Sequence, residues 1–240
     1  MNVTKKGKLM NKHLEEVAKS YDEAIDLGKQ GINRYESLPD YITKDPDFVL
    51  YKKCLETDNT QEDSIQIIRN FLEPNQHKRF VDMGCCLNYM FRGYDQWPSL
   101  YYGVDISPKT IQLLQEVSVK RNKAVGALVC ESMHKTSFED NYFHIGQCIG
   151  SLEYFESEFV EQCLAEFYRV LKPKGRFILD IPRQDSPESR IAMMIEDYLG
   201  RTDQFSLSEA QFEKILSRYF HVEKKEACGP MKLYYLTRLD

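Results

Sequence analysis

The chain has 240 residues, of which 42% are hydrophobic and 12% aromatic, so it can bury a sizeable core as a single globular unit. Its formal net charge is -5, from 32 basic and 37 acidic residues, which leaves no overall positive field to hold nucleic acid. The basic N-terminal stretch lacks the apolar run of a secretory signal, and no segment is apolar over the length that crosses a bilayer.

These properties predict a cytoplasmic protein with no nucleic-acid partner and no membrane partner. The seven cysteines are odd in number and include no C-x-x-C pair, which argues against both a disulfide framework and a zinc site. We therefore expect reduced thiols and no bound metal.

Residues 1–79 are expected to form a helical cap or lid. The spacing of apolar residues in "HLEEVAKSYDEAI" predicts an amphipathic helix with Gly28 and Gly31 as stops, and a second helical stripe ends before Pro74. Aromatic residues between the two either pack within the cap or line a ligand pocket. The apolar face of the first helix consists of Leu14, Val17, Ala18, Tyr21 and Ile25, and the aromatic residues are Tyr35, Tyr41, Phe48 and Tyr51.

Residues 80–240 alternate short apolar runs with helical patterns, which predicts an α/β fold with a parallel sheet and crossover helices. Ser-Pro pairs at 107–108 and 186–187 mark helix starts, and Ser208 with Gln211 predicts a capping box. A helical stripe over 160–171 is expected to end at "KPKG", and two extended runs around "CGP" predict a terminal hairpin. The expected parallel strands are "RFVDM", "LYYGVDI", "ALVCE", "FHIGQCI" and "RFILDI".

In such a sheet, a ligand binds at the carboxyl ends of the strands, where the strand order reverses. Asp82 and Gly84 lie at the end of the first expected strand and Asp105 ends the second, near the ~20-residue separation at which a carboxylate reaches ribose hydroxyls. Taken alone, Asp105 could equally cap the helix that starts at Ser107. The positions after the third and fourth strands are Glu131, Ser132, Gly150, Ser151, Leu152, Glu153 and Tyr154.

Over about its last two-thirds, the chain resembles the class I S-adenosylmethionine-dependent methyltransferases, especially the small-molecule branch that includes ubiquinone-type enzymes. The similar segments are "VDMGCCLN", "YYGVDIS", "CESM", "IGSLEYF" and "EFYRVLKPKGRFILDIP", and their order and spacing carry the resemblance. It implies a doubly wound, Rossmann-like sheet of seven strands with a terminal antiparallel hairpin. Residues 1–79 would be the lid, and 80–240 the cofactor-binding core.

The resemblance also implies an activity. The protein would transfer a methyl group from S-adenosylmethionine to an oxygen or nitrogen atom of a small-molecule acceptor, leaving S-adenosylhomocysteine. Tyr21 would reach the cofactor from the lid, although the helical stripe gives it an equally good packing role. The implied cofactor-binding residues are Tyr21, Asp82, Gly84, Cys85, Cys86, Asp105, Ile106, Glu131, Ser132, Met133 and Ile149.

The first cofactor loop departs from the family pattern of acid-x-Gly-x-Gly-x-Gly. Only Gly84 is kept, and Cys86 and Asn88 stand at the later glycine positions. Since asparagine can adopt left-handed backbone angles and cysteine is small, we expect a reshaped loop. The alternative role of Cys85 and Cys86 is that of small packing residues.

Glu153, Tyr154 and His134 are the expected catalytic residues. Many relatives have Glu-His after the fourth strand where this chain has Glu153 and Tyr154, so the group that titrates near neutral pH is missing there. Tyr154 would orient the acceptor or pack under the lid, and His134 lies in a loop as another possible base.

Two other functions remain open at this point. One is a non-catalytic protein that binds S-adenosylmethionine, because the loop is altered and the histidine is absent. The other is a nicotinamide-dependent oxidoreductase, since an acid after the second strand occurs in both classes.

Overall fold

The computed structural model describes residues 5–57 and 61–240 of the chain. Its centre is a single seven-stranded sheet, as the resemblance implies. The strands are β1 (Arg79–Met83), β2 (Leu100–Asp105), β3 (Val125–Cys130), β4 (Phe143–Cys148), β5 (Leu171–Pro182), β6 (Phe220–Cys228) and β7 (Met231–Arg238).

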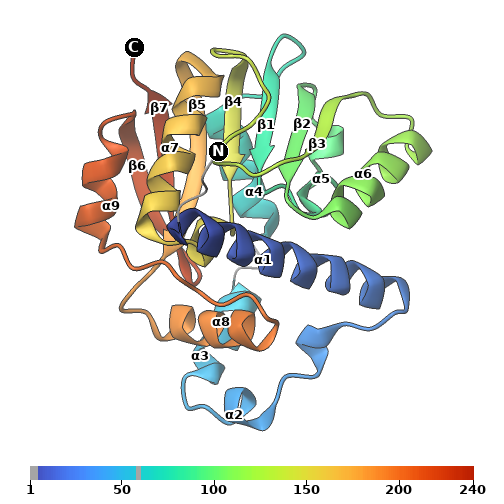
Figure 1. Ribbon diagram of the computed structural model, residues 1–240, viewed down its shortest axis with the longest axis vertical. Coiled ribbons are helices and arrows are strands. Elements are labelled where there is room, and N and C mark those ends of the chain that lie inside the picture. Colours follow the sequence, from blue (N-terminus) through green and yellow to red (C-terminus); the bar gives the residue numbers. More distant parts are fainter. Residues whose placement is uncertain (1–4, 58–60) are drawn as a thin grey trace.

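The strand order across the sheet is β3-β2-β1-β4-β5-β7-β6 (Figure 1). Strands β1 to β5 are parallel, whereas β7 runs antiparallel to both β5 and β6, which confirms the terminal hairpin. The chain passes from β1 outward to β2 and β3 and then returns to the other side of β1 with β4. The order therefore reverses between β1 and β4, where open α/β sheets bind their ligands.

Helices cover both faces of this sheet and one end of it (Figure 1). The α-helices are α1 (Lys5–Lys29), α2 (Asp40–Thr43), α3 (Phe48–Thr57), α4 (Gln61–Leu72), α5 (Asn88–Phe91), α6 (Pro108–Lys120), α7 (Ser157–Val170), α8 (Pro187–Tyr198) and α9 (Glu209–Leu216), and the 3-10 turns are η1 (Arg34–Glu36), η2 (Tyr94–Gln96) and η3 (Leu152–Tyr154).

The two faces of the sheet bury separate apolar layers because side chains alternate along each strand. On β1, Phe80 packs in the layer formed with α4 and α6, where its ring lies 5.0 Å from the ring of Trp97. Val81 packs in the opposite layer with α7 and α9, which contribute Phe167 and Phe212. Burial on both faces explains why the strands read as continuous apolar runs.

Helix α1 crosses the carboxyl ends of the parallel strands and is tied to α6 (Figure 1). The Oδ1 atom of Asp22 accepts hydrogen bonds from the Ser107 hydroxyl at 2.6 Å and from the Lys109 backbone N–H at 3.2 Å. Asp26 forms an ion pair with the same lysine. These contacts fix α1 over the place where the strand order reverses.

The rest of the cap combines segments from both ends of the chain. Ile42 of α2 is buried against Ile191 and Ile195 of α8, and Phe48 of α3 packs against the same cluster. A C-terminal helix therefore completes the helical cap, and the predicted boundary between 79 and 80 stays a prediction. No helix in the two described ranges is both long and apolar enough to span a membrane.

Two local predictions were wrong, and two short helices were not predicted. Leu171, expected to end a helical stripe, is the first residue of β5 and pairs with Phe143, because α7 ends one residue earlier. The aromatic segment before residue 58 contains the unpredicted helices α2 and α3, whose stability comes from α8. Gly28 lies inside α1, and the chain turns instead at Gly31, where φ is 75°.

Two helix caps provide a matched test of how the lid is held. The Ser107 side chain accepts a hydrogen bond from the Thr110 N–H and also donates to Asp22, whereas the Ser208 side chain only completes its capping box. We expect Ser208→Ala to lower the free energy of unfolding by about 1 kcal/mol, and Ser107→Ala by about 2–3 kcal/mol. Urea unfolding curves measure both. Equal losses would show that the bond to Asp22 contributes nothing.

Candidate functional site

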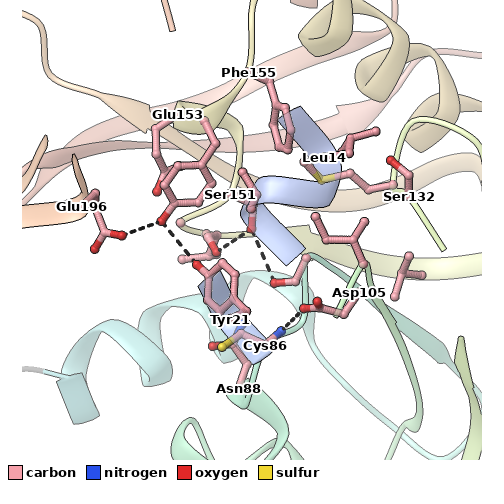
Figure 2. Close-up of a pocket in the computed structure, with 18 of the residues that line it drawn as sticks. Leu14, Tyr21, Cys86, Asn88, Asp105, Ser132, Ser151, Glu153, Phe155 and Glu196 are labelled. Atoms are coloured by element: carbon pink, nitrogen blue, oxygen red, sulfur yellow. Dashed lines mark hydrogen bonds between the residues drawn. The ribbon is translucent and has the colours of Figure 1, made fainter. Parts of the chain in front are cut away.

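A cavity of about 340 Å³ lies under α1 at the carboxyl ends of the central strands, where a ligand is expected. This volume falls in the range of small-molecule pockets. Its walls come from α1, from the segments after β1, β2, β3 and β4, and from α8 (Figure 2). The lining residues include Leu14, Val17, Tyr21, Tyr35, Gly84, Cys86, Asn88, Arg92, Asp105, Ile106, Glu131, Ser132, Met133, Ile149, Ser151, Glu153, Tyr154, Phe155 and Glu196.

The loop after β1 keeps a tight shape although it has only one glycine. Gly84 has φ of 70°, and a Cβ atom there would lie 2.2 Å from the Ser151 Oγ atom. Cys86 also has positive φ, 39°, whereas Asn88 begins helix α5. Asn88 does not use its capacity for left-handed angles, because the loop turns two residues earlier, at Cys86.

Asp105 joins this loop to helix α6. Its Oδ2 atom accepts the backbone N–H of Cys86 at 2.8 Å, and its Oδ1 atom accepts the backbone N–H of Ser107 at 2.8 Å. Burial raises the pKa of Asp105 to about 6, so the carboxylate is ionised at neutral pH. It caps the helix and also lines the cavity, with lone pairs left to accept further hydrogen bonds.

Asp82 and Cys85 do not line the cavity. The Asp82 side chain is fully buried and accepts hydrogen bonds from the Tyr101 hydroxyl at 2.9 Å and the Gln147 amide at 2.9 Å. Burial raises its pKa to about 7. Cys85 is also fully buried and packs beside Tyr101. These two residues support the loop from within the core.

The segment after β3 supplies one wall. Glu131, Ser132 and Met133 line the cavity, and Glu131 Oε2 accepts the Ser137 N–H at 2.8 Å. His134 lies outside the lining, hydrogen bonded to the Ser132 hydroxyl at 2.6 Å. Its ring packs 4.8 Å from that of Phe159, and burial lowers the pKa of His134. The structure thus places this histidine behind the wall.

A polar network closes the end of the cavity under the lid (Figure 2). The hydroxyl oxygens of Tyr21 and Tyr154 lie 3.3 Å apart, and the Tyr154 hydroxyl donates to Glu196 Oε2 at 3.1 Å. Arg201 is buried behind them and donates from Nε to the same carboxylate at 2.6 Å. The Tyr35 hydroxyl donates to Glu196 Oε1 at 3.1 Å.

The sequence did not point to Glu196 or Arg201. Both follow the Ser186 helix start, but only the tertiary fold brings them to Tyr21, which is more than 170 positions earlier in the sequence. Of the aromatic cap residues, Tyr35 lines the cavity, whereas Phe48 and Tyr51 pack against α8.

Glu153 brings an unpaired polar atom to the cavity. The residue is only 5% exposed, and its Oε2 atom is buried with no hydrogen-bond partner among the described residues. Burial and the nearby charge of Asp180 raise the pKa of Glu153 well above its usual value. A protonated carboxyl group can donate a hydrogen bond to a ligand, and a buried polar atom without a partner costs free energy until it does so.

The comparisons with known proteins agree with this geometry. Residues 81–179 match the family described as "Methyltransferase domain". No curated protein matches the sequence. A protein from Pyrococcus horikoshii has a similar solved structure, with a TM-score of 0.62 at 20% identity over 87% of this chain and 100% of that one.

Two further similar solved structures are named as methyltransferases. Geranyl diphosphate C-methyltransferase from Streptomyces coelicolor, in complex with Mg²⁺, geranyl diphosphate and S-adenosyl-L-homocysteine, has a TM-score of 0.61 at 13% identity, covering 78% of this chain and 83% of that one. A SAM-dependent methyltransferase from Methanosarcina mazei has a TM-score of 0.57 at 16% identity, covering 72% and 97%. At these identities the similarity shows the fold.

The loop geometry predicts that substitutions at Gly84 and Cys86 change the free energy of unfolding by different amounts. Gly84→Ala should lower the free energy of unfolding by at least about 2 kcal/mol, because the left-handed angle and the contact with Ser151 both penalise a Cβ atom. Cys86→Gly should stay within about 1 kcal/mol of wild type, since relieved strain offsets the entropy of glycine. Urea unfolding measures both, and similar losses for the two variants would contradict this description.

The buried carboxyl of Asp82 predicts a pH dependence of stability. Its pKa is about 7 in the folded protein and ~4 when unfolded, so the folded state binds the proton more tightly. Its contribution is fully present below about pH 4 and is lost as the pH rises to about 7. The stability of Asp82→Asn relative to wild type should therefore increase over this window, as measured by urea unfolding at several pH values. A constant difference would contradict the raised pKa.

Proposed function

We propose that this protein is an enzyme that methylates an oxygen or nitrogen atom of a small-molecule acceptor, because residues 81–179 match the methyltransferase domain family and the sheet has the fold of solved S-adenosylmethionine-dependent methyltransferases. S-adenosylmethionine supplies a methyl group on a positively charged sulfonium, which is already activated for displacement. The proposal of an oxygen or nitrogen acceptor rests on the hydrogen-bonded path from the cavity through Tyr154 to Glu196, because such an acceptor must lose a proton.

The residues around the cavity fit this cofactor. Asp105 keeps acceptor capacity for ribose hydroxyls after binding two backbone N–H groups. Ile106 and Met133 offer apolar surface for a flat base. Gly84 places the backbone of the loop in the cavity lining, and the unpaired Glu153 Oε2 needs a polar partner. The proposed cofactor-binding residues that line the cavity are Tyr21, Gly84, Cys86, Asp105, Ile106, Glu131, Ser132, Met133 and Ile149.

The same walls would align the reactants and exclude water. Tyr21, Tyr154 and Phe155 enclose the end of the cavity beneath α1, and Tyr21 and Tyr154 are held in place by their hydrogen bonds. Fixed alignment in a dry pocket can lower a barrier by ~7–11 kcal/mol in favourable cases. Since the methyl donor is already activated, this contribution is the main one that the protein has to make.

A hydroxyl or ammonium acceptor must also lose a proton. Burial raises the pKa of Tyr154 well above its usual value, so its phenol stays neutral. The Tyr154 oxygen can take the proton from the substrate's hydroxyl or ammonium group. At the same time, the Tyr154 hydroxyl proton passes to Glu196 Oε2, 3.1 Å away. Arg201 and Tyr35 hold that carboxylate in position. Glu153, kept protonated by its raised pKa, would donate a hydrogen bond rather than accept the proton.

The path to Glu196 predicts the effect of one isosteric exchange. With S-adenosylmethionine and a panel of hydroxyl- and amine-bearing compounds, Glu196→Gln should lower kcat by ~10²–10⁴, because the amide cannot take up the proton that the carboxylate accepts. The affinity for S-adenosylhomocysteine, measured by calorimetry, should not change. Glu188→Gln, on the same helix but outside the lining, is the control.

Two results would contradict the proposal. An unchanged kcat in Glu196→Gln would exclude the proton path. Adenosyl binding by the wild-type protein without turnover on any compound of the panel would favour a non-catalytic binding protein instead.

A further inference from the structure

A second cavity, of about 300 Å³, lies farther along α1 from the first. One wall is the helix, with Leu27 and Gly28, and the opposite walls come from Ile32, Phe91 and Leu199. Phe91 is 74% exposed, so an aromatic ring lies at the surface beside this cavity. Nothing in the proposed methyl transfer uses this space.

The two cavities share a wall of polar side chains. Tyr35 lines both of them, while Arg201 lines the second and Glu196 the first. Arg201 Nη2 donates to the Tyr35 hydroxyl at 2.8 Å, and its guanidinium lies 4.5 Å from the centre of the Tyr21 ring. Tyr35 is half exposed on the short turn η1, and its side chain is tied to this wall by the hydroxyl bonds to Glu196 and Arg201.

The charged residues that line the second cavity are all positive. Its lining contains Arg34 and Arg201 and no acidic residue. Arg201 is paired with Glu196, which faces the first cavity. Arg34 donates to the backbone carbonyls of Tyr198 and Leu199 at 2.8 and 3.3 Å, and no carboxylate in the described part of the chain pairs with it. Its positive charge therefore remains available beside an apolar space.

We propose that the second cavity binds an anionic group carried on an apolar part of the acceptor, while the nucleophile lies at the Tyr21 and Tyr154 end of the first cavity. This inference rests on the proposed methyl transfer and names its acceptor class: a hydroxyl or amine compound with an apolar body and a negative charge. To join the two cavities, Tyr35 gives up its hydrogen bonds to Glu196 and Arg201, and the Nε–H of Arg201 keeps Glu196 in position. Charge complementarity with Arg34 and apolar contact with Leu27 and Phe91 select such a compound.

Gly28 offers a direct test. A Cβ atom added there would meet nothing within 4 Å, and the residue has helical geometry and lines the second cavity. Gly28→Phe should therefore fill the cavity without straining the backbone, and Gly28→Ala is the matched control. Octanoate, octanol and octylammonium, which share one chain length, are titrated by calorimetry into wild type and both variants.

We expect octanoate to bind wild type and Gly28→Ala, and to bind Gly28→Phe at least tenfold more weakly. Octanol and octylammonium should bind wild type more weakly than octanoate, and Arg34→Gln should remove the difference between octanoate and octanol. Equal octanoate binding by Gly28→Phe, no binding by folded wild type, or octanol binding as tightly as octanoate would overturn the proposal.

A parallel titration with S-adenosylhomocysteine separates the two proposals. Equal affinity in wild type, Gly28→Ala and Gly28→Phe would show that the first cavity is intact. Failure of this ligand to bind any of the folded proteins would contradict the proposed methyl transfer, whereas the octanoate results would still report on the second cavity.

Discussion

A single buried carboxylate holds the site together. Asp105 accepts the N–H of Cys86 in the loop after β1 and the N–H of Ser107 at the start of α6, and Ser107 in turn donates to Asp22 of the lid. A carboxylate so buried is costly unless its oxygens are satisfied, so the loop and the helix start must stay where they are. The positions of the loop after β1, of α6 and of α1 therefore depend on one another.

This arrangement also explains how the altered loop keeps its shape. Cys86 adopts a left-handed backbone angle that costs a non-glycine residue ~1–2 kcal/mol, and its N–H bond to Asp105 holds it there. Gly84 is different, because no side chain fits between it and Ser151. The loop thus needs glycine at position 84, where a side chain would collide with Ser151. At position 86, a cysteine can adopt the left-handed angle that the loop requires.

The sequence predicted the features that local patterns encode. The strand at residues 79–83, the caps at Ser107 and Ser208, and the terminal hairpin follow from apolar runs and capping residues, and all are present. Short helices in the cap escaped prediction because α8 stabilises them. The hydrogen-bond network from Tyr21 to Glu196 and Arg201 could not be predicted either, because it joins three segments that are far apart in the sequence and meet only in the fold.

The most direct test of the account is a calorimetric titration of the purified protein, under reducing conditions, with S-adenosylhomocysteine and with reduced nicotinamide cofactor. We expect the adenosyl ligand alone to bind, and Asp105→Ala to bind it at least tenfold more weakly while remaining folded by thermal unfolding. A folded wild-type protein that does not bind it, or an Asp105→Ala variant that binds it as tightly as wild type, would contradict the assignment of this cavity.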